Sequence, residues 1–141
     1  MAANALTTPA EPWRAYPSFA FGDGAELADE LAALVVAGRK RATVMLPEDP
    51  DRPVLGQKSL VLDGRGEPIC VIETTELFLR RFDEIDEAFA FEEGEGDRTL
   101  ASWREGHENY FRRLGVFSPD MTLLCEHFRL VEVLRAMDLD A

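Results

Sequence analysis

Hydrophobic residues recur with a helical period near the start of the chain. They stand at positions i, i+4, i+7 and i+8 and therefore share one helix face: Leu27, Leu31, Leu34 and Val35. Asp23, followed three residues later by a second acid, resembles a capping box at the start of this helix. Gly38 can cap its end. The pattern predicts a helix that delivers residues 39–43 just past its last turn.

Four later segments carry the apolar patterns that are typical of strands. They are residues 43–46, 58–63, 68–79 and 121–134, and the last is long enough to be bent or broken in two. The Asp-Gly-Arg-Gly sequence of residues 63–66 predicts a tight hairpin between the second and third of these strands.

Two more helices are predicted between the third and fourth strands. The first covers residues 82–91, with Ile85 and Phe89 facing inward. The second is capped by Asp97 and ends near Gly115. The element order is helix, strands, two helices and strand. It indicates an α+β fold in which a small barrel-like sheet is flanked by helices.

The length of 141 residues fits one domain with a single core. We expect this domain over residues 16–136, with a loose segment over 1–15 and a short tail over 137–141. The longest apolar stretch, residues 31–37, is too short to span a bilayer, so no membrane association is expected. No signal peptide is visible, and a cytoplasmic location is the default expectation.

The chain is strongly acidic, with 27 acids, 15 bases and a net charge of −12. Because binding to long nucleic acid is driven by neutralisation of phosphates, this charge argues against a long duplex as a partner. A small nucleoside or a short single-stranded RNA is the expected partner. The two cysteines and two histidines lack the paired spacing of a zinc site, and no cofactor is predicted.

The cationic segment Gly-Arg-Lys-Arg-Ala-Thr at residues 38–43 is the first candidate for chemistry. Lys40 stands three residues before Thr43, which is one way to assemble an amine base and a hydroxyl nucleophile. Arg39 and Arg41 flank Lys40, and their charges act to lower the pKa of its amine. The alternative is a solvated turn followed by a β-branched residue that begins a strand.

The second candidate for chemistry is a group of acidic residues within residues 83–97, a stretch in which no basic residue stands among the acids. Most of them fit a solvated face and a helix cap. Glu93 and Glu95 stand beside glycines, where a carboxylate can reach into a cleft. Either can orient Lys40 or act as a general acid or base. Metal binding is the weaker interpretation, because the run lacks the spacing of an EF-hand.

Aromatic residues on one face of the last helix form the third candidate. Trp103, His107 and Tyr110 share this face. They either pack in the core or, in the case of Trp103 and Tyr110, edge a pocket and stack on a flat base. Arg104 can then reach the pocket rim.

Taken together, an ordered set of short motifs resembles the ASCH domain family. No single motif is specific, but the set runs from Phe19 to Leu134. It comprises residues 19–23 (Phe-Ala-Phe-Gly-Asp), 38–43, 54–58 (Val-Leu-Gly-Gln-Lys), 68–75, 93–97 (Glu-Gly-Glu-Gly-Asp) and Trp103-Arg-x-x-His107. The resemblance implies a PUA-like β-barrel with flanking helices.

The resemblance also implies a function, because some ASCH proteins are similar to an amidohydrolase that removes the acetyl group from N4-acetylcytidine nucleosides. Its motif is a Lys, a Thr three residues later and a downstream Glu. By position these map to Lys40, Thr43 and Glu95, with Glu93 as the second choice for the acid. The chain has a larger loop after Thr43 than the compact deacetylating members. We therefore expect an amide hydrolase with a Thr nucleophile and a Lys base.

Two other functions stay open at this point. The first is a PUA-like module that binds RNA without turnover, through a basic groove formed by Arg39, Arg41, Arg80 and Arg81. The second is a single-stranded ribonuclease that uses a divalent metal, which requires the carboxylates of residues 93–97 to converge on one point. Only the ribonuclease alternative calls for a metal.

Overall fold

The computed structural model describes residues 11–137. The described part begins with a short 3₁₀-helix, η1 (Pro12–Ala15), inside the segment that was expected to be loose. The rest of that expected loose segment, residues 1–10, lies outside the described residues. Residues 138–141 of the expected tail also lie outside them.

Five strands form one open sheet. They are β1 (Ser18–Phe19), β2 (Ala42–Met45), β3 (Lys58–Leu62), β4 (Pro68–Arg81) and β5 (Thr122–Val133), in the spatial order β1-β3-β4-β5-β2. β1 runs parallel to β3, and the other neighbouring strands are antiparallel. The α+β class is confirmed. The barrel is not, since β1 and β2 lie at opposite edges of the described sheet and do not pair with each other.

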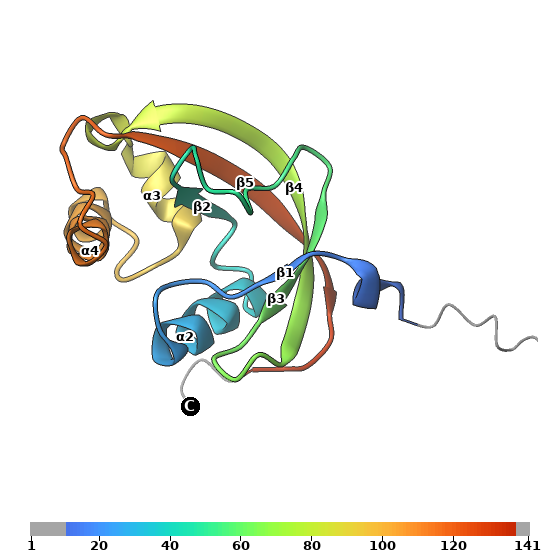
Figure 1. Cartoon of the computed structure of the whole chain (residues 1–141). Helices are drawn as coiled ribbons and strands as arrows, with labels where there is room; N and C mark the ends of the chain where they lie inside the picture. The colour runs from blue at the N-terminus through green and yellow to red at the C-terminus, as the bar shows by residue number, and fades with distance from the viewer. Residues whose placement is uncertain (1–10, 138–141) are drawn as a thin grey trace, which may run out of the picture.

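The long β4–β5 pair gives the sheet its curvature. β4 and β5 pair over most of their length, with register shifts between Val71 and Ile72 and between Thr74 and Glu76. Such bulges bend a strand and increase its twist. The predicted long last strand is therefore a single element that curves, as Figure 1 shows, around the helices on its concave side.

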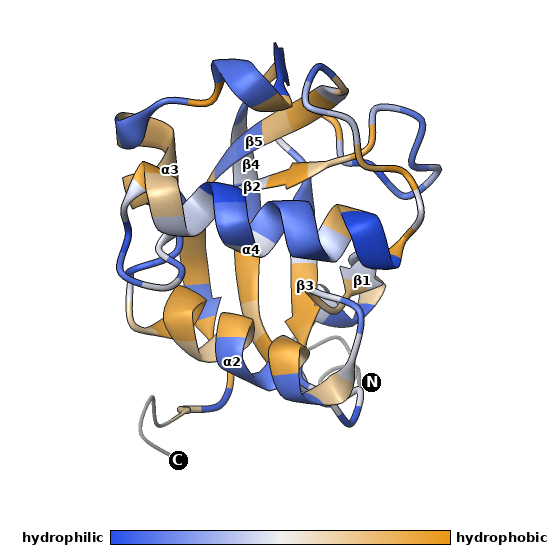
Figure 2. Ribbon diagram, turned by 90° about the vertical axis from the view of Figure 1, so that its left-hand side faces the viewer, coloured by the Kyte–Doolittle hydropathy of each residue, from blue (hydrophilic) through white to orange (hydrophobic). Residues whose placement is uncertain are grey.

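Three α-helices cover this concave side: α2 (Ala25–Val36), α3 (Glu87–Glu93) and α4 (Leu100–Arg113). One buried cluster joins α2 to the middle of the sheet and includes Leu31, Val35 and Phe128. A second cluster joins α3 and α4 to β2 and β5 and includes Phe89 and Phe111. The buried apolar residues of α2 pack against the sheet, and in Figure 2 α4 runs across the front of the molecule above α2.

Helix ends differ from the sequence prediction at three places. Gly24 occupies the N-cap of α2 without a side-chain bond, and Asp23 instead accepts hydrogen bonds from Arg113. The predicted helix over residues 82–91 is split into the 3₁₀-helix η2 (Phe82–Glu84) and α3. Thr99, not Asp97, caps α4, because its side chain accepts from the Ser102 N–H.

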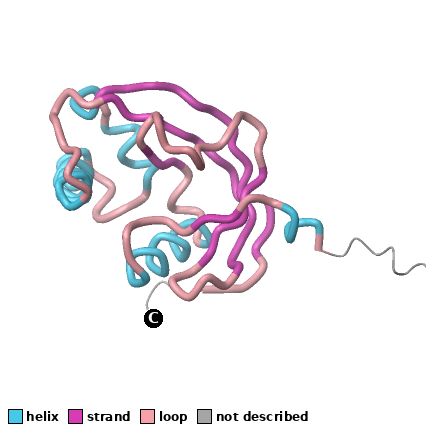
Figure 3. The backbone as a smooth tube through the Cα atoms, in the orientation of Figure 1, coloured by secondary structure: helices cyan, strands magenta, loops and turns pink. Residues whose placement is uncertain are grey.

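Gly38 is confirmed as the residue that ends α2. Its φ of 79° lies in the left-handed region, where glycine meets no Cβ penalty. The chain reverses there and enters β2 at the sheet edge (Figure 3). This reversal places Lys40 between the end of α2 and the start of β2.

Candidate functional site

Lys40 points into the protein. Its side chain is buried, with 1% of the residue exposed. Its Nζ donates to Glu93 Oε1 at 2.7 Å, to Glu95 Oε2 at 2.7 Å and to the carbonyl oxygen of Ala42 at 2.8 Å. The three donors of an ammonium group are thus all satisfied by acceptors. Two of these acceptors are carboxylates, and the third belongs to the residue directly before Thr43.

Glu93 is the acid at the centre of the cluster. It is fully buried at the end of α3, and its second oxygen, Oε2, accepts from Trp103 Nε1 at 2.9 Å. The same oxygen lies 3.3 Å from His107 Nε2. His107 Nδ1 lies 2.9 Å from the carbonyl oxygen of Trp103. Because both ring nitrogens face acceptors, the arrangement favours the doubly protonated, imidazolium form of His107.

The charges in the cluster set the protonation states. Burial opposes the charge on Lys40, but Glu93 and Glu95 outweigh it and hold the pKa of the amine above its ordinary value. Burial likewise opposes ionisation of Glu93, yet Lys40 and His107 hold its pKa well below the usual range. For Glu95 burial prevails over the attraction of Lys40, and its pKa is raised. Lys40 is therefore charged at rest, and Glu95 is the acid that most readily takes up a proton.

Gly94 lets the two acids reach Lys40. A Cβ at this position would lie 2.1 Å from the carbonyl oxygen of Arg39, and its φ of 75° is in the left-handed region. A hydrogen bond from the Arg41 backbone N–H to the Glu92 carbonyl oxygen, at 2.7 Å, also holds these two segments together. Glycine between the two acids therefore brings the end of α3 against the segment that carries Lys40.

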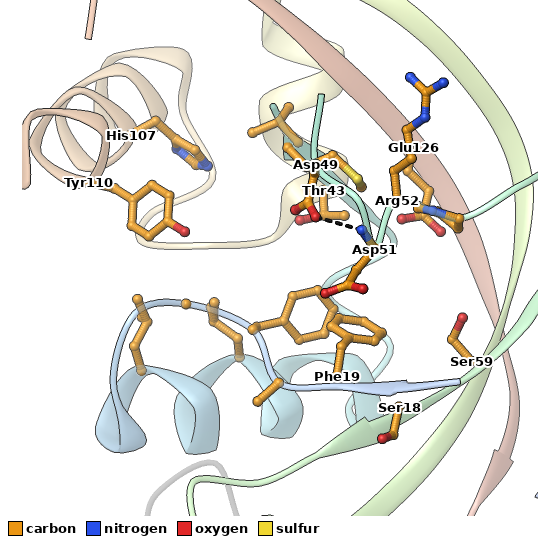
Figure 4. Close-up of a pocket in the computed structure, with 18 of the residues that line it drawn as sticks. Ser18, Phe19, Thr43, Asp49, Asp51, Arg52, Ser59, His107, Tyr110 and Glu126 are labelled. Atoms are coloured by element: carbon orange, nitrogen blue, oxygen red, sulfur yellow. Dashed lines mark hydrogen bonds between the residues drawn. The ribbon is translucent and has the colours of Figure 1, made fainter. Parts of the chain in front are cut away.

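A pocket of about 730 Å³ opens beside this cluster (Figure 4). Its walls come from β1, β2, β3, β5, α2 and α4, from the loop after β2 and from the segment between α3 and α4. Thr43 and Glu126 face it from the sheet, and His107 and Tyr110 face it from α4. Its other polar side chains are Ser18, Asp49, Asp51, Arg52, Gln57, Ser59, Glu95 and Arg113.

Comparison with known proteins places the chain in a family. The family model described as ASCH domain matches residues 17–132. The chain belongs to the ASCH domain family. An ASCH domain from Lactobacillus crispatus is 32% identical, with a TM-score of 0.76, and the match covers 93% of this chain and 87% of that one.

Two other solved structures extend the comparison. A protein from Enterococcus faecalis is 34% identical with a TM-score of 0.75, over 83% of this chain and 77% of that one. An ASCH protein from Zymomonas mobilis shares the fold at 14% identity and a TM-score of 0.57, over 89% of this chain and 73% of that one. No curated protein matches the chain.

The ASCH domain brings together some of the residues singled out in the sequence. Thr43, Glu95 and Tyr110 line the pocket, while Lys40 and Glu93 form the buried cluster beneath it. The hydroxyl, the amine and the carboxylate of the predicted set therefore lie in one region. Figure 4 shows Thr43 and Tyr110 directed into the same space.

Of the six residues that were expected to bind substrate, Tyr110 lines the pocket, Glu93 is buried in the Lys40 cluster, and the other four lie elsewhere. Arg39 does not line the pocket, and exposed Arg41 pairs with Glu92 at 2.9 Å. Trp103 is only 3% exposed, and its ring stacks on His107, so it supports the cluster and does not present a face to a ligand. Arg104 donates to backbone carbonyls of η2 and of Ile85. Sequence spacing predicted that these side chains reach the pocket, but core packing and ion pairs hold them in other places.

Several pocket residues were absent from the predicted set. His107 stood in a quoted motif, but its contact with Glu93 depends on the packing of α3 against α4. Asp49, Asp51 and Arg52 lie in the Pro-rich loop that follows Thr43, so their nearness in sequence was an available signal. No sequence pattern pointed to Glu126, because it comes to lie opposite Thr43 only through the pairing of β2 with β5.

The residues present do not fit a divalent metal. One oxygen or nitrogen from each of Glu93, Glu95 and His107 lies within 4.8 Å of the others, as metal ligands do. However, both carboxylates already accept from the Lys40 ammonium, and both ring nitrogens of His107 already face oxygen atoms of the protein. A cation would have to displace Lys40 from its partners. The acids of residues 93–97 thus converge on an amine, while Asp97 binds Thr99.

None of the helices in residues 11–137 has the length and apolar character needed to cross a bilayer.

His107 is expected to make stability depend on pH. Burial opposes its charge, but Glu93 outweighs this and raises the pKa of the imidazole above its ordinary value. A raised folded-state pKa adds stability that is complete below the unfolded pKa of about 6.5 and is lost as pH rises through the folded value. Urea unfolding from pH 6 to 9 should therefore show a decline in stability that is weaker in His107→Gln.

The control for this prediction is His127→Gln, which changes the other histidine, on β5. Its ring contacts Glu76 and not the Lys40 cluster. Each variant is compared by its pH slope and not by its absolute stability, because the Trp103 stacking is also lost in His107→Gln. Parallel slopes for the wild-type protein and His107→Gln would show that His107 carries no extra proton in the folded state.

Proposed function

We propose that this ASCH domain is an amide hydrolase that removes the acyl group from an acylated nucleoside such as N4-acetylcytidine. One observation carries the proposal. Lys40 Nζ is bonded both to Glu95 and to the carbonyl of the residue before Thr43, at a pocket that Thr43 and Glu95 line. An amine, a hydroxyl and a carboxylate in one place are the parts of an activated nucleophile.

The first step starts from a charged Lys40, so the amine must lose a proton before it can act as a base. Glu95 accepts that proton along the 2.7 Å hydrogen bond, which its raised pKa favours. The neutral amine then takes the proton of Thr43 while the hydroxyl oxygen attacks the acyl carbonyl. Glu93 stays ionised and keeps the amine in position.

The second step releases the nucleoside. The bond between the acyl carbon and nitrogen breaks, and the leaving nitrogen takes the proton now on Lys40. Water then attacks the acyl-Thr43 ester and gives one proton to the amine. The amine passes this proton to the Thr43 oxygen as the ester bond breaks, so the hydroxyl re-forms, the carboxylic acid departs and the amine is neutral again. Glu95 returns its proton to Lys40 at the end of the cycle, so all protons are accounted for.

The pocket suits a ligand the size of a nucleoside. Its volume of about 730 Å³ lies within the usual range of small-molecule sites, roughly 300–1,000 Å³. Phe19, Phe21 and Tyr110 give it aromatic walls. The ring of Tyr110 is the candidate for stacking on the base.

The experiment is an assay of N4-acetylcytidine with the purified protein, in which released cytidine is separated by chromatography and identified by mass. We expect cytidine and acetate in equal amounts, without added metal and in the presence of a chelator. No release of cytidine at high enzyme concentration would rule out this function.

The two alternatives predict different outcomes with RNA. A binding module needs a basic groove, but Arg41 is paired with Glu92 and Arg81 with Asp83. Mobility shifts of a short single-stranded RNA at two salt concentrations test for such a groove, since the shift must weaken as salt rises. Cleavage of that RNA only in the absence of chelator would support the ribonuclease.

A further inference from the structure

Glu126 is a buried acid that the proposed reaction does not use. It lies on β5, is only 4% exposed and lines the pocket. No lysine, arginine or histidine of the described residues forms an ion pair with it. Burial raises the pKa of this carboxyl, opposed by the hydrogen bond from Thr74. An acid buried without an ion-pair partner is costly and calls for a reason.

Within residues 11–137, only one oxygen of the Glu126 carboxylate accepts a hydrogen bond. Thr74 Oγ1 donates to Oε2 at 2.6 Å, whereas Oε1 accepts no hydrogen bond from residues 11–137. A glutamine could accept the Thr74 bond without a charge, so tying β4 to β5 does not by itself require an acid. The Thr74 bond fixes the carboxyl and leaves Oε1 available to a ligand.

Glu126 lies next to Thr43, the proposed nucleophile, on the neighbouring strand. It is the cross-strand partner of Thr43 in the β2–β5 register. Such partners project on the same face of a sheet, with Cβ atoms about 4.5–5.5 Å apart. Figure 4 shows both residues at the same wall of the pocket. A ligand whose acyl carbon meets Thr43 must place the atoms next to that carbon near Glu126.

Ser59 and Gln57 complete this polar wall. Gln57 Nε2 donates to Ser59 Oγ at 3.0 Å, and the Gln57 backbone carbonyl accepts from the Thr74 N–H at 2.9 Å. Because Ser59 Oγ is held as an acceptor, its own proton is free to be donated. Ser59 thus offers a donor and Glu126 an acceptor to a ligand in the pocket.

We propose that Glu126 is a specificity-determining residue that accepts a hydrogen bond from the exocyclic N–H of a pyrimidine nucleoside. This inference rests on the proposed function for the identity of the ligand. It assigns the pocket to bases with an amino or acylamino group, since a carbonyl at the same place would face the lone pairs of Oε1. The cytosine family fulfils this condition and uracil does not.

The test measures binding of three nucleosides by calorimetry at pH 8: cytidine, uridine and 2-pyrimidinone riboside, which has hydrogen in place of the amino group. We expect the wild-type protein to prefer cytidine by at least about tenfold, the effect of one hydrogen bond to a charged group. Glu126→Met, of similar length but without an acceptor, should bind all three within about twofold of one another. Equal binding of the three by the wild-type protein overturns the inference.

Two further variants keep the test decisive. Glu132→Gln changes an exposed acid on the same strand and should keep the full preference for cytidine. Thr74→Val retains the carboxyl and should also keep a preference. If Glu126→Met fails to fold, as shown by circular dichroism, Glu126→Gln replaces it and must reduce the preference. If a Glu126 variant folds and keeps the wild-type preference for cytidine, a group other than Glu126 recognises the base.

The outcomes separate the two proposals. Turnover of N4-acetylcytidine together with a preference that is independent of Glu126 rejects this inference and leaves the proposed function standing. A preference that depends on Glu126 without turnover rejects the hydrolase and leaves the recognition site. Absence of binding by all three nucleosides rejects the recognition site, and the turnover assay then decides the proposed function by itself.

Discussion

Replacing Thr43 with valine should lower the rate of N4-acetylcytidine hydrolysis by at least about a thousandfold, as expected for loss of a nucleophile. The hydroxyl is the only group removed, because valine keeps the β-branched shape. It also keeps the preference for strands, so β2 should remain paired with β5. The measurement is the initial rate of cytidine release by the variant at saturating substrate.

Two companion variants define what this result means. Thr122→Val makes the same chemical change at the exposed start of β5 and should leave the rate unchanged. Thr43→Ser restores a hydroxyl and should recover part of the activity. If Thr43→Val retained the wild-type rate while folding normally, another group would have to be the nucleophile.

Replacing Lys40 with methionine should destabilise the fold by about 3–5 kcal/mol, the usual result of breaking a buried ion pair from one side. Glu93 has no exposed surface, and the variant would leave it with Trp103 and His107 as its remaining partners. Because small domains are stable by only about 5–15 kcal/mol, such a loss is visible in a urea denaturation curve. Hydrolysis should also disappear, since the proposed base is removed.

The neighbouring ion pair provides the matched control. The side chains of Arg41 and Glu92 are 49% and 35% exposed, so this is a surface pair and Arg41→Met should cost less than about 1 kcal/mol. A second comparison separates charge from packing. Glu93→Gln added to Lys40→Met removes the uncompensated carboxylate and should recover part of the lost stability. Equal effects of Lys40→Met and Arg41→Met would show that the buried cluster contributes no more than a surface pair.

Local patterns were sufficient for most of the fold. The helical period predicted α2, and the left-handed conformation at Gly38 agrees with its predicted end. The hairpin between β3 and β4 followed from turn chemistry at residues 63–66. Failures occurred at helix starts, where Asp23 and Asp97 found other donors. Asp23 accepts from Arg113 of a distant element, which sequence spacing does not reveal. Asp97 instead accepts from the neighbouring Thr99, which is itself the cap of α4.

The proposed pair of Lys40 and Thr43 was also predicted from local sequence. Lys40 and Thr43 are close along the chain, so their spacing already linked an amine and a hydroxyl. The spacing could not give the protonation state of Lys40. Flanking arginines were expected to lower the pKa of the amine, but the two carboxylates buried against it hold that pKa above its ordinary value. The distance from Nζ to Glu93 and Glu95 depends on a contact across more than fifty residues.

The amino-acid sequence was enough to establish the α+β class, from local patterns, and the ASCH resemblance, from motifs in a fixed order along the chain. It also predicted the Lys40–Thr43 pair, because these two residues are close together in the chain. Tertiary structure alone decided that Trp103 supports Glu93, that His107 lies against Glu93 and that Glu126 stands opposite Thr43. These are properties of burial and of charges brought together by packing. In a buried cluster the energy of each group depends on its neighbours in space, and the chain order does not contain those distances.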